Sequence, residues 1–399
     1  MPRGRMRIPY LQIVVLGLSL ARVPAWAESQ ATPAPAADAV EAAIDHTRSL
    51  EYDLARTQLE AWLASHPADL RALNYLASTI LQREIFEREM ADGRLEAAKS
   101  RQGPPPMPES SRKQLFDVLA RAESSANERL RQFPQDQDAL YWNGITHMIR
   151  SVYQFGFAKS NTSALKEAKE ARKFHVQLLA INPAYVDAMM LPGMYDYIAG
   201  SIPWSMRVLS AIIGIHGDKQ RGLAAMERVA REGKWARVEA RQFLAIFYYR
   251  EKRYGESISL MEQVASEYPR NFVVLQHLAR AHKAQGNWQK AAETYELMAS
   301  RFHSGDPGYQ KLPVAKTLYL AGEAYAKAGD MAKAQQLYAE AEKRSDDSIF
   351  VYRAALAAGG VDQQQNRPED ARRRFQRVAS AVPATDEGRA AREHLKKLP

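Results

Sequence analysis

Apolar residues recur every three or four positions from about residue 38 to the C-terminus, among residues dominated by Ala, Leu, Glu, Arg, Lys and Gln. This spacing places the apolar side chains on one face of an α-helix, and these residue types favour helix formation. No segment shows the alternation of apolar and polar residues, bounded by turn residues, that is typical of β-hairpins. The sequence therefore predicts an all-α protein.

The helices are expected to form about eight antiparallel pairs, because prolines and turn residues interrupt the apolar pattern at regular intervals. The predicted pairs span residues 39–66, 70–133, 138–181, 185–231, 235–268, 271–302, 314–344 and 348–382. A polar, charged segment over residues 386–395 is predicted to be a capping helix. A terminal repeat needs such a helix, because no neighbour covers its outer face.

A recurring pattern of small and large residues marks where the two helices of a pair meet. A small residue is followed by a large one four positions later and by Pro eight positions further on, as in Ala55/Leu59/Pro67, Ser257/Met261/Pro269 and Ala371/Phe375/Pro383. A second small residue lies twelve positions earlier and precedes an aromatic residue or His, as in Ala245/Tyr248, Ala279/His282 and Gly322/Tyr325. This pattern resembles the tetratricopeptide repeat (TPR). The resemblance implies a TPR-like α-solenoid whose surface holds a partner.

Three pairs carry additional residues in the turn between their two helices. The small residues of a regular pair are 12 positions apart, but they are 27 apart in the third pair (Gly144 to Ala171) and about 31 apart in the fourth. The second pair contains the run Gly-Pro-Pro-Pro at 103–106. Because all three lie in the same kind of turn, we expect them on one rim. These insertions either contribute to function or only lengthen the helices and cover apolar surface.

The insertion of the fourth pair is an amphipathic segment within residues 198–215. Its hydrophobic residues over 202–214 are Trp204, Val208, Leu209, Ile212 and Ile213. A stripe of this kind either packs against the protein core or contacts a hydrophobic ligand, a membrane surface or a partner. Pro203 and Arg207 argue against a membrane span.

The region around this insertion has a more specific resemblance. The run Leu-Pro-Gly-Met-Tyr-Asp-Tyr at 191–197 is followed by Ile-Pro at 202–203, Gly-Ile-His-Gly-Asp at 214–218 and Gly-Leu at 222–223. Over about residues 135–300 this resembles the tetratricopeptide-repeat-39 (inclusion-body-clearance) family and its exported bacterial relatives. The resemblance implies interaction or lipid-associated homeostasis rather than catalysis. Independently of it, Asp218 is predicted to cap the N-terminus of the next helix.

The N-terminus has the three regions of a secretory signal peptide. Arg3, Arg5 and Arg7 are followed by an apolar run at 11–21 and by Ala-Trp-Ala at 25–27. We expect cleavage after Ala27 and a periplasmic or secreted protein. The alternatives are an amphipathic first helix and an uncleaved anchor. The predicted organisation is a signal peptide (1–27), an Ala/Pro-rich linker (28–37), helices with insertions (38–234), and regular repeats with the capping helix (235–399).

The composition excludes several kinds of covalent, catalytic and metal site. The chain has no cysteine, which excludes disulfides, thiolate nucleophiles and Cys-ligated zinc. Four of the arginines behind the net charge of +9 lie in the predicted signal peptide, so the remaining surplus is mild and does not indicate nucleic-acid binding. No H-E-x-x-H, G-x-S-x-G or Walker motif is present. We therefore predict no catalytic residue, metal or cofactor.

A binding groove is the better-supported prediction. In this repeat the first helix of each pair lines the concave groove. The candidate residues on these helices are Gln242, Tyr249, Arg250, Gln276, Arg280, Lys283, Tyr319, Glu323 and Lys327. Aromatic, amide and basic groups suit an extended peptide or an acidic segment, although a merely solvated face is the alternative. We thus predict a non-enzymatic exported scaffold for a protein or peptide, with a hydrophobic-ligand or membrane-surface protein as the alternative.

Overall fold

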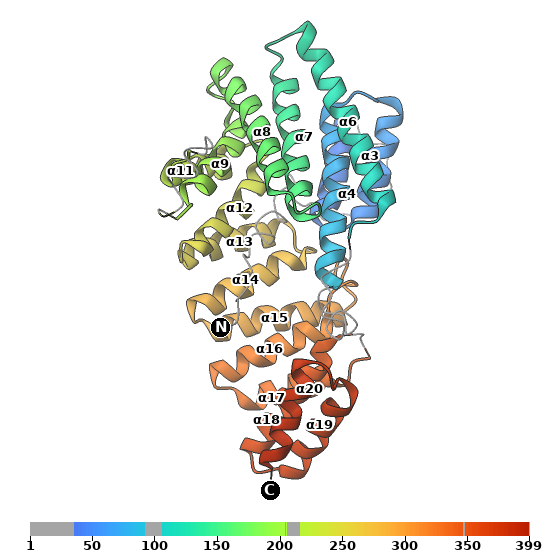
Figure 1. The fold of residues 1–399 in the computed structure, drawn as a ribbon, viewed down its shortest axis with the longest axis vertical. Helices are drawn as coiled ribbons and strands as arrows, with labels where there is room; N and C mark the ends of the chain where they lie inside the picture. The colour runs from blue at the N-terminus through green and yellow to red at the C-terminus, as the bar shows by residue number, and fades with distance from the viewer. Residues whose placement is uncertain (1–35, 92–105, 204, 206–215, 346–347, 399) are drawn as a thin grey trace. The chain divides into compact units, whose positions relative to one another are not determined.

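The protein is described by a computed structural model over residues 36–91, 106–203, 205, 216–345 and 348–398. Within these ranges it consists of 17 α-helices and one short 3₁₀ helix, and it contains no β-strand (Figure 1). The predicted all-α architecture is confirmed. None of the helices described is both long enough and apolar enough to span a bilayer. The predicted signal peptide and nearly all of the linker lie outside the described residues.

The helices follow one another as the predicted antiparallel pairs. The first four pairs are α2 (Ala36–Arg48) with α3 (Tyr52–Ser65), α4 (Leu70–Ala91) with α6 (Glu109–Gln132), α7 (Gln137–Gly156) with α8 (Asn161–Ile181), and α9 (Met190–Gly200) with α11 (Lys219–Glu232). A 3₁₀ helix, η1 (Val186–Met189), precedes α9. The next four pairs are α12 (Arg237–Arg250) with α13 (Tyr254–Glu267), α14 (Phe272–Gln285) with α15 (Trp288–His303), α16 (Val314–Ala328) with α17 (Met331–Glu342), and α18 (Ile349–Gln364) with α19 (Pro368–Ala381). The capping helix is α20 (Asp386–Lys397).

The described residues divide into two compact units. The first contains residues 36–85 and 106–268, which include α2, α3 and α6 to α13. The second contains the last turns of α4 and residues 269–398, which include α14 to α20. In this division α12, which packs on α11, and α13 lie in the first unit.

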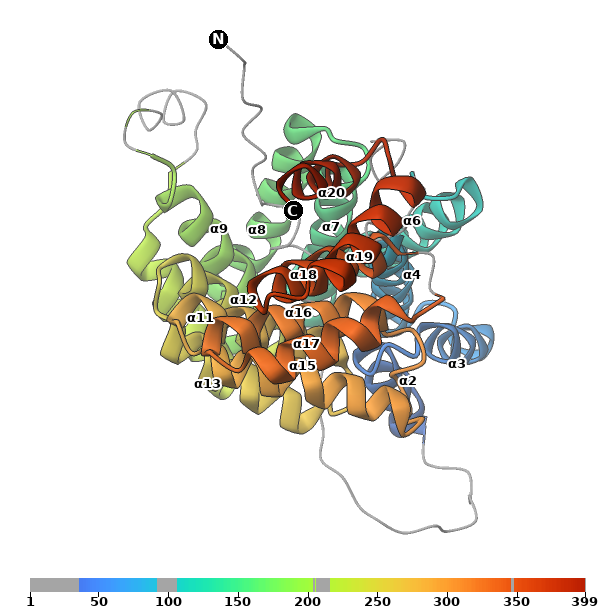
Figure 2. The same ribbon diagram turned by 90° about the horizontal axis from the view of Figure 1, so that it is seen from below.

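Within the second unit, each helix packs on the next one along the chain from α14 to α20. In addition, α16 packs on α18 and α18 packs on α20, so that first helices of successive pairs are neighbours (Figure 2). This is the stacking that places the first helices on one face, as expected for a repeat whose units bury their apolar sides against each other.

The insertion of the third pair is helical. It lengthens α7 to 20 residues and α8 to 21 residues. Tyr153 is buried near the end of α7, where its ring packs edge-on against Phe116 and stacks on Phe157. The additional residues thus extend the pair and bury aromatic surface. In the other two insertions, residues 92–105, 204 and 206–215 lie outside the described residues. These include Trp204, Val208, Leu209, Ile212 and Ile213, and their use in binding stays a prediction.

Asp218 caps α11 as the sequence predicted, because its carboxylate accepts a hydrogen bond from the backbone N–H of Arg221 at 2.9 Å. Asp136, Asn287 and Asp330 cap α7, α15 and α17 in the same way. These caps satisfy N–H groups that have no partner within the helix. They explain why the helix starts could be located from the sequence.

Small residues are required where the helices of a pair cross. A Cβ atom added to Gly359 of α18 would lie 2.7 Å from Cε1 of Phe375, whose ring in α19 is fully buried. A Cβ on Gly322 would lie 2.6 Å from Cε1 of Tyr338 in α17. By contrast, a Cβ on Gly360 would meet no atom within 4 Å. The spacing of small residues in the sequence therefore reflects direct helix–ring contacts.

In the third pair, a histidine takes the place that Phe375 and Tyr338 have in the later pairs, and its imidazole is buried. His175 of α8 packs against Gly144, and its ring stacks on Tyr141 at 5.0 Å. The Nδ1 atom lies 3.1 Å from the carbonyl oxygen of Ala188, and Nε2 lies 3.1 Å from that of Tyr141. Burial lowers the pKa of His175 to about 4, although both carbonyls act in the opposite direction. The imidazole is thus neutral in the folded protein near neutral pH.

Gly359→Ala should destabilise the protein by about 1–3 kcal/mol, because the added methyl group overlaps the Phe375 ring. The neighbouring Gly360→Ala variant is the matched control and should be neutral or stabilising by up to about 1 kcal/mol, since Ala is the better helix former and its Cβ meets nothing. Urea unfolding monitored by circular dichroism measures both values. Equal effects of the two substitutions would contradict the contact.

The unfolding free energy should fall by about 2 kcal/mol between pH 7 and pH 5 through His175. The reason is that the unfolded state, with an ordinary histidine pKa near 6.5, takes up the proton before the folded state does. His175→Gln removes this titration, so its stability should depend less on pH in this range than that of the unsubstituted protein. Urea unfolding at pH 7 and at pH 5 gives the change in unfolding free energy for each protein. An equal change in both proteins would exclude His175 as the cause.

Candidate functional site

The first helices of the first unit pack on one another instead of leaving an open groove. Side chains from four of them surround a buried cavity of only about 20 Å³, among them Tyr75 of α4, Tyr141 of α7, Met190 of α9 and Glu239 of α12. The face that lines the groove in this type of repeat is therefore interior here. The side chains that line this cavity are all buried.

A buried arginine joins the beginning and the end of this unit. Arg48, at the end of α2, is only 1% exposed. Its guanidinium donates a hydrogen bond to the Tyr268 hydroxyl at 2.9 Å and to the Asp45 carboxylate at 3.3 Å. It also lies 3.7 Å from the carboxylate of Glu239. These contacts connect residues that are about two hundred positions apart and hold α2 against α12 and α13.

The predicted groove residues of the first unit lie in different surroundings. Gln242 is 3% exposed and packs inside the unit, so it does not line an accessible surface. Tyr249 is 38% exposed and contacts the Tyr254 ring edge-on. The guanidinium of Arg250 lies 5.7 Å from the ring centre of the buried Tyr197. These three side chains therefore differ in their exposure and in their neighbours.

The structure does bring predicted residues of the second unit together. Lys283 of α14 donates a hydrogen bond to the carboxylate of Glu323 in α16 at 2.6 Å. Tyr319, one turn before Glu323, packs on Tyr338 and Phe350. The remaining candidates on these helices are Gln276, which is half-buried, and Arg280 and Lys327, which are exposed. The pair Lys283–Glu323 shows that α14 and α16 present a shared face.

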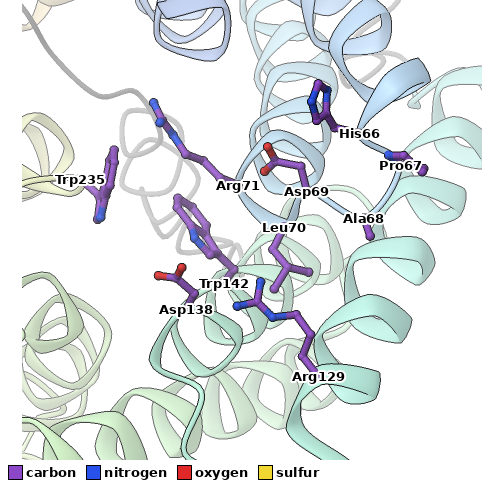
Figure 3. Close-up of a pocket in the computed structure, with 10 residues that line it drawn as sticks. All are labelled: His66, Pro67, Ala68, Asp69, Leu70, Arg71, Arg129, Asp138, Trp142 and Trp235. Carbon is purple, nitrogen blue, oxygen red and sulfur yellow. The ribbon is translucent and has the colours of Figure 1, made fainter. Parts of the chain in front are cut away.

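A second candidate site is an open pocket of about 520 Å³ in the first unit (Figure 3). Its walls come from the turn before α4, the end of α6, the first turns of α7 and the turn before α12. The lining residues are His66, Pro67, Ala68, Asp69, Leu70, Arg71, Arg129, Asp138, Trp142 and Trp235. Figure 3 shows the two indoles across from each other, with Arg71 and Asp138 reaching the space between them from opposite sides.

The charged residues of this pocket are held by neighbours. The Arg71 guanidinium forms an ion pair with Glu41 and stacks at 4.5 Å on the Trp235 ring. The Arg129 side chain donates two hydrogen bonds to Asp136, at 2.8 and 3.0 Å. These pairs fix the direction of both guanidinium groups.

Carboxylates cap two helix starts at or beside the pocket, and Asp69 belongs to its lining. Asp69 accepts hydrogen bonds from the Ala72 backbone N–H at 3.0 Å and from the Trp62 indole at 2.8 Å. Asp187 accepts from the backbone N–H groups of Lys234, Trp235 and Ala236, which precede α12. Because carboxylates already occupy these helix N-termini, the ends do not offer a free anion site.

The sequence-based reasoning missed this pocket. A signal for it exists, because a tryptophan lies at the opening of the first helix in the third and fifth pairs (Trp142 and Trp235). Periodicity alone cannot show that two such openings come together. Among the described residues, no three acidic or histidine side chains are grouped so that they could hold a metal ion.

The arrangement defines an α-solenoid of antiparallel helix pairs, and comparison with known proteins identifies the repeat. Models of the tetratricopeptide repeat match residues 40–104, 248–316 and 316–348. The chain is a tetratricopeptide repeat protein. Such repeats are in general scaffolds for protein–protein interaction, and proteins built from them are typically not enzymes. No curated protein sequence matches the chain.

Several solved structures are similar to the chain. PilW, a type IV pilus biogenesis factor, is 15% identical, with 61% of this chain and 93% of that chain covered and a TM-score of 0.38. A tetratricopeptide repeat protein from Parabacteroides merdae is 16% identical, with 80% and 96% covered and a TM-score of 0.30. IFIT1 in complex with Gppp-AAAA is 12% identical, with 97% and 84% covered and a TM-score of 0.37.

Arg48→Met should destabilise the protein by about 3–5 kcal/mol, because it leaves the Glu239 carboxylate buried without its ion-pair partner. The double variant Arg48→Met, Glu239→Gln should recover part of this loss, since no charge is then stranded. Lys113→Met, which breaks the exposed ion pair with Asp117, should cost no more than about 1 kcal/mol. Urea unfolding distinguishes the three variants, and similar costs for Arg48→Met and Lys113→Met would contradict the role of Arg48.

Proposed function

We propose that the protein is an exported, non-enzymatic scaffold that binds an extended segment of a protein partner through the face shared by α14 and α16. The observation that carries this proposal is the contact between Lys283 and Glu323 at 2.6 Å, which joins one candidate residue of α14 to one of α16. The tetratricopeptide repeats in this region, which in general bind proteins, support the same conclusion. In the described part of the first unit, the corresponding side chains of four first helices are buried around a small cavity.

The charge of this face favours an acidic segment. Arg280, Lys283 and Lys327 are basic, whereas Glu323 is the acidic residue among the candidates. Counted over these candidates, three basic side chains stand against one carboxylate, and this surplus of positive charge attracts carboxylates. Tyr319 and Gln276 add an aromatic surface and an amide, which suit the side chains and the backbone of an extended peptide.

Export is supported by the N-terminal sequence. Its basic start, its apolar run at 11–21 and the Ala-Trp-Ala motif at 25–27 have the order of a secretory signal peptide. The absence of cysteine is compatible with an oxidising compartment, since no thiol is left to oxidise. In this proposal the partner is a protein of the periplasm or of the cell exterior.

Reversing the exposed charges of the face, with Arg280→Glu and Lys327→Glu together, should abolish binding of a fluorescein-labelled Glu/Ser peptide without unfolding the protein. Lys283 is left unchanged, because its reversal would also break the pair with Glu323. Fluorescence anisotropy measures binding, and circular dichroism checks the fold. Binding by the unsubstituted protein should weaken as salt is added, because the attraction is between exposed charges.

The matched control reverses one lysine and one arginine on second helices of the same unit, with Lys343→Glu and Arg373→Glu. Both residues are exposed, and the change in net charge is the same. This variant should bind the Glu/Ser peptide as the unsubstituted protein does. Equal loss in both variants would show a response to net charge alone, and stronger binding of a Lys/Ser peptide would contradict an acidic partner.

A further inference from the structure

The pocket of Figure 3 has the size and the lining of a binding site. Its volume of about 520 Å³ lies within the range of roughly 300–1,000 Å³ that is typical of ligand pockets. Leu70, Trp142 and Trp235 supply apolar surface. The exposed turn at 66–68 forms one edge, so that a side chain has a route into the space.

The charges of the lining cancel. Two arginines, Arg71 and Arg129, face two aspartates, Asp69 and Asp138. The ion pairs with Glu41 and Asp136 engage both guanidinium groups, and two hydrogen bonds engage Asp69. An anionic occupant therefore meets guanidinium groups that are already paired with carboxylates, and any charged occupant loses hydration on entering. A neutral apolar occupant avoids this cost and covers the indole surface.

The walls favour a ring over an aliphatic chain. The Trp142 and Trp235 rings lie 6.5 Å apart at an angle of 56°, and Trp142 is only 6% exposed. Tyr75 and Tyr141 pack edge-on against Trp142, while Arg71 stacks on Trp235. Indole edges and planar guanidinium groups interact well with an aromatic ring. Because neighbouring residues already hold these side chains in place, binding costs little side-chain conformational entropy.

We propose that this pocket receives a neutral aromatic side chain, phenylalanine or tryptophan, from an extended segment of a protein partner. The protein nature of the occupant rests on the proposed scaffold function. An anchor residue in a preformed pocket walled by Trp and Arg is the arrangement that commonly dominates the affinity of a protein interface. The site is separate from the face of α14 and α16 and would define a second point of contact with a partner.

Fluorine NMR on the full chain labelled with fluorotryptophan tests this assignment. Trp142→Phe and Trp235→Phe variants identify the two resonances. The probes are capped pentapeptides Gly-Gly-X-Gly-Gly in which X is Trp, Phe, Ala, Lys or Asp. The Trp and Phe peptides should shift the resonances of Trp142 and Trp235 in a saturable way, whereas the Ala, Lys and Asp peptides should not. Larger shifts with Lys or Asp, or no shift with any peptide, would overturn the proposal.

Two substitutions test the location without removing a wall contact. Ala68→Phe places a ring in the pocket opening and should weaken binding of the Trp peptide about tenfold or more. Ala64→Phe, on the exposed surface of α3 outside the lining, is the matched control and should leave binding unchanged. An equal loss with Ala64→Phe, or no loss with Ala68→Phe, would refute the assignment.

These results are independent of the acidic-peptide experiment. If the neutral aromatic peptides do not bind while Arg280→Glu with Lys327→Glu still abolishes acidic-peptide binding, the pocket assignment alone is wrong. If the aromatic peptides bind as expected and the charge reversal has no effect, the proposed face on α14 and α16 is wrong and the pocket assignment stands.

Discussion

Each regular helix pair depends on a close contact between a small residue on one helix and a large side chain on the other. At Gly359 and Gly322 an added methyl group would overlap the rings of Phe375 and Tyr338. Because the backbone approaches the ring directly, the ring is buried and the two helices have a defined crossing point. Repetition of this contact fixes the geometry of one pair after another. The third pair keeps the same constraint with Gly144 and His175, although its helices are longer.

The same repeat packs differently in the two units. In the first unit, the contacts of Arg48 with Tyr268 and Glu239 hold the first pair against the fifth. The first helices then bury their inner faces against each other, and a surface that could bind a partner becomes a core. In the second unit, α16 and α18 are neighbours in a stack that carries Tyr319 and Glu323 on α16. A partner surface therefore depends on how successive pairs are arranged, and not on the repeat alone.

The pocket of the first unit follows from this packing. It forms where the openings of several first helices converge, and its carboxylates serve first as helix caps and ion-pair partners. The remaining lining includes the Trp142 and Trp235 indoles. Thus the interactions that hold the helix ends in place also affect which chemistry the pocket can accept, because they engage both guanidinium groups and leave apolar surface.

The sequence alone determined the helix pairs, their order and the caps, because these depend on interactions within one or two helices. The spacing of Ala371 and Phe375 and the position of Asp218 are examples. It could not show that Gln242 is buried, since that depends on which other segments pack against α12. Nor could it join Trp142 to Trp235 in one pocket. Local periodicity specifies which face of a helix is apolar, whereas only tertiary packing decides which neighbour covers that face.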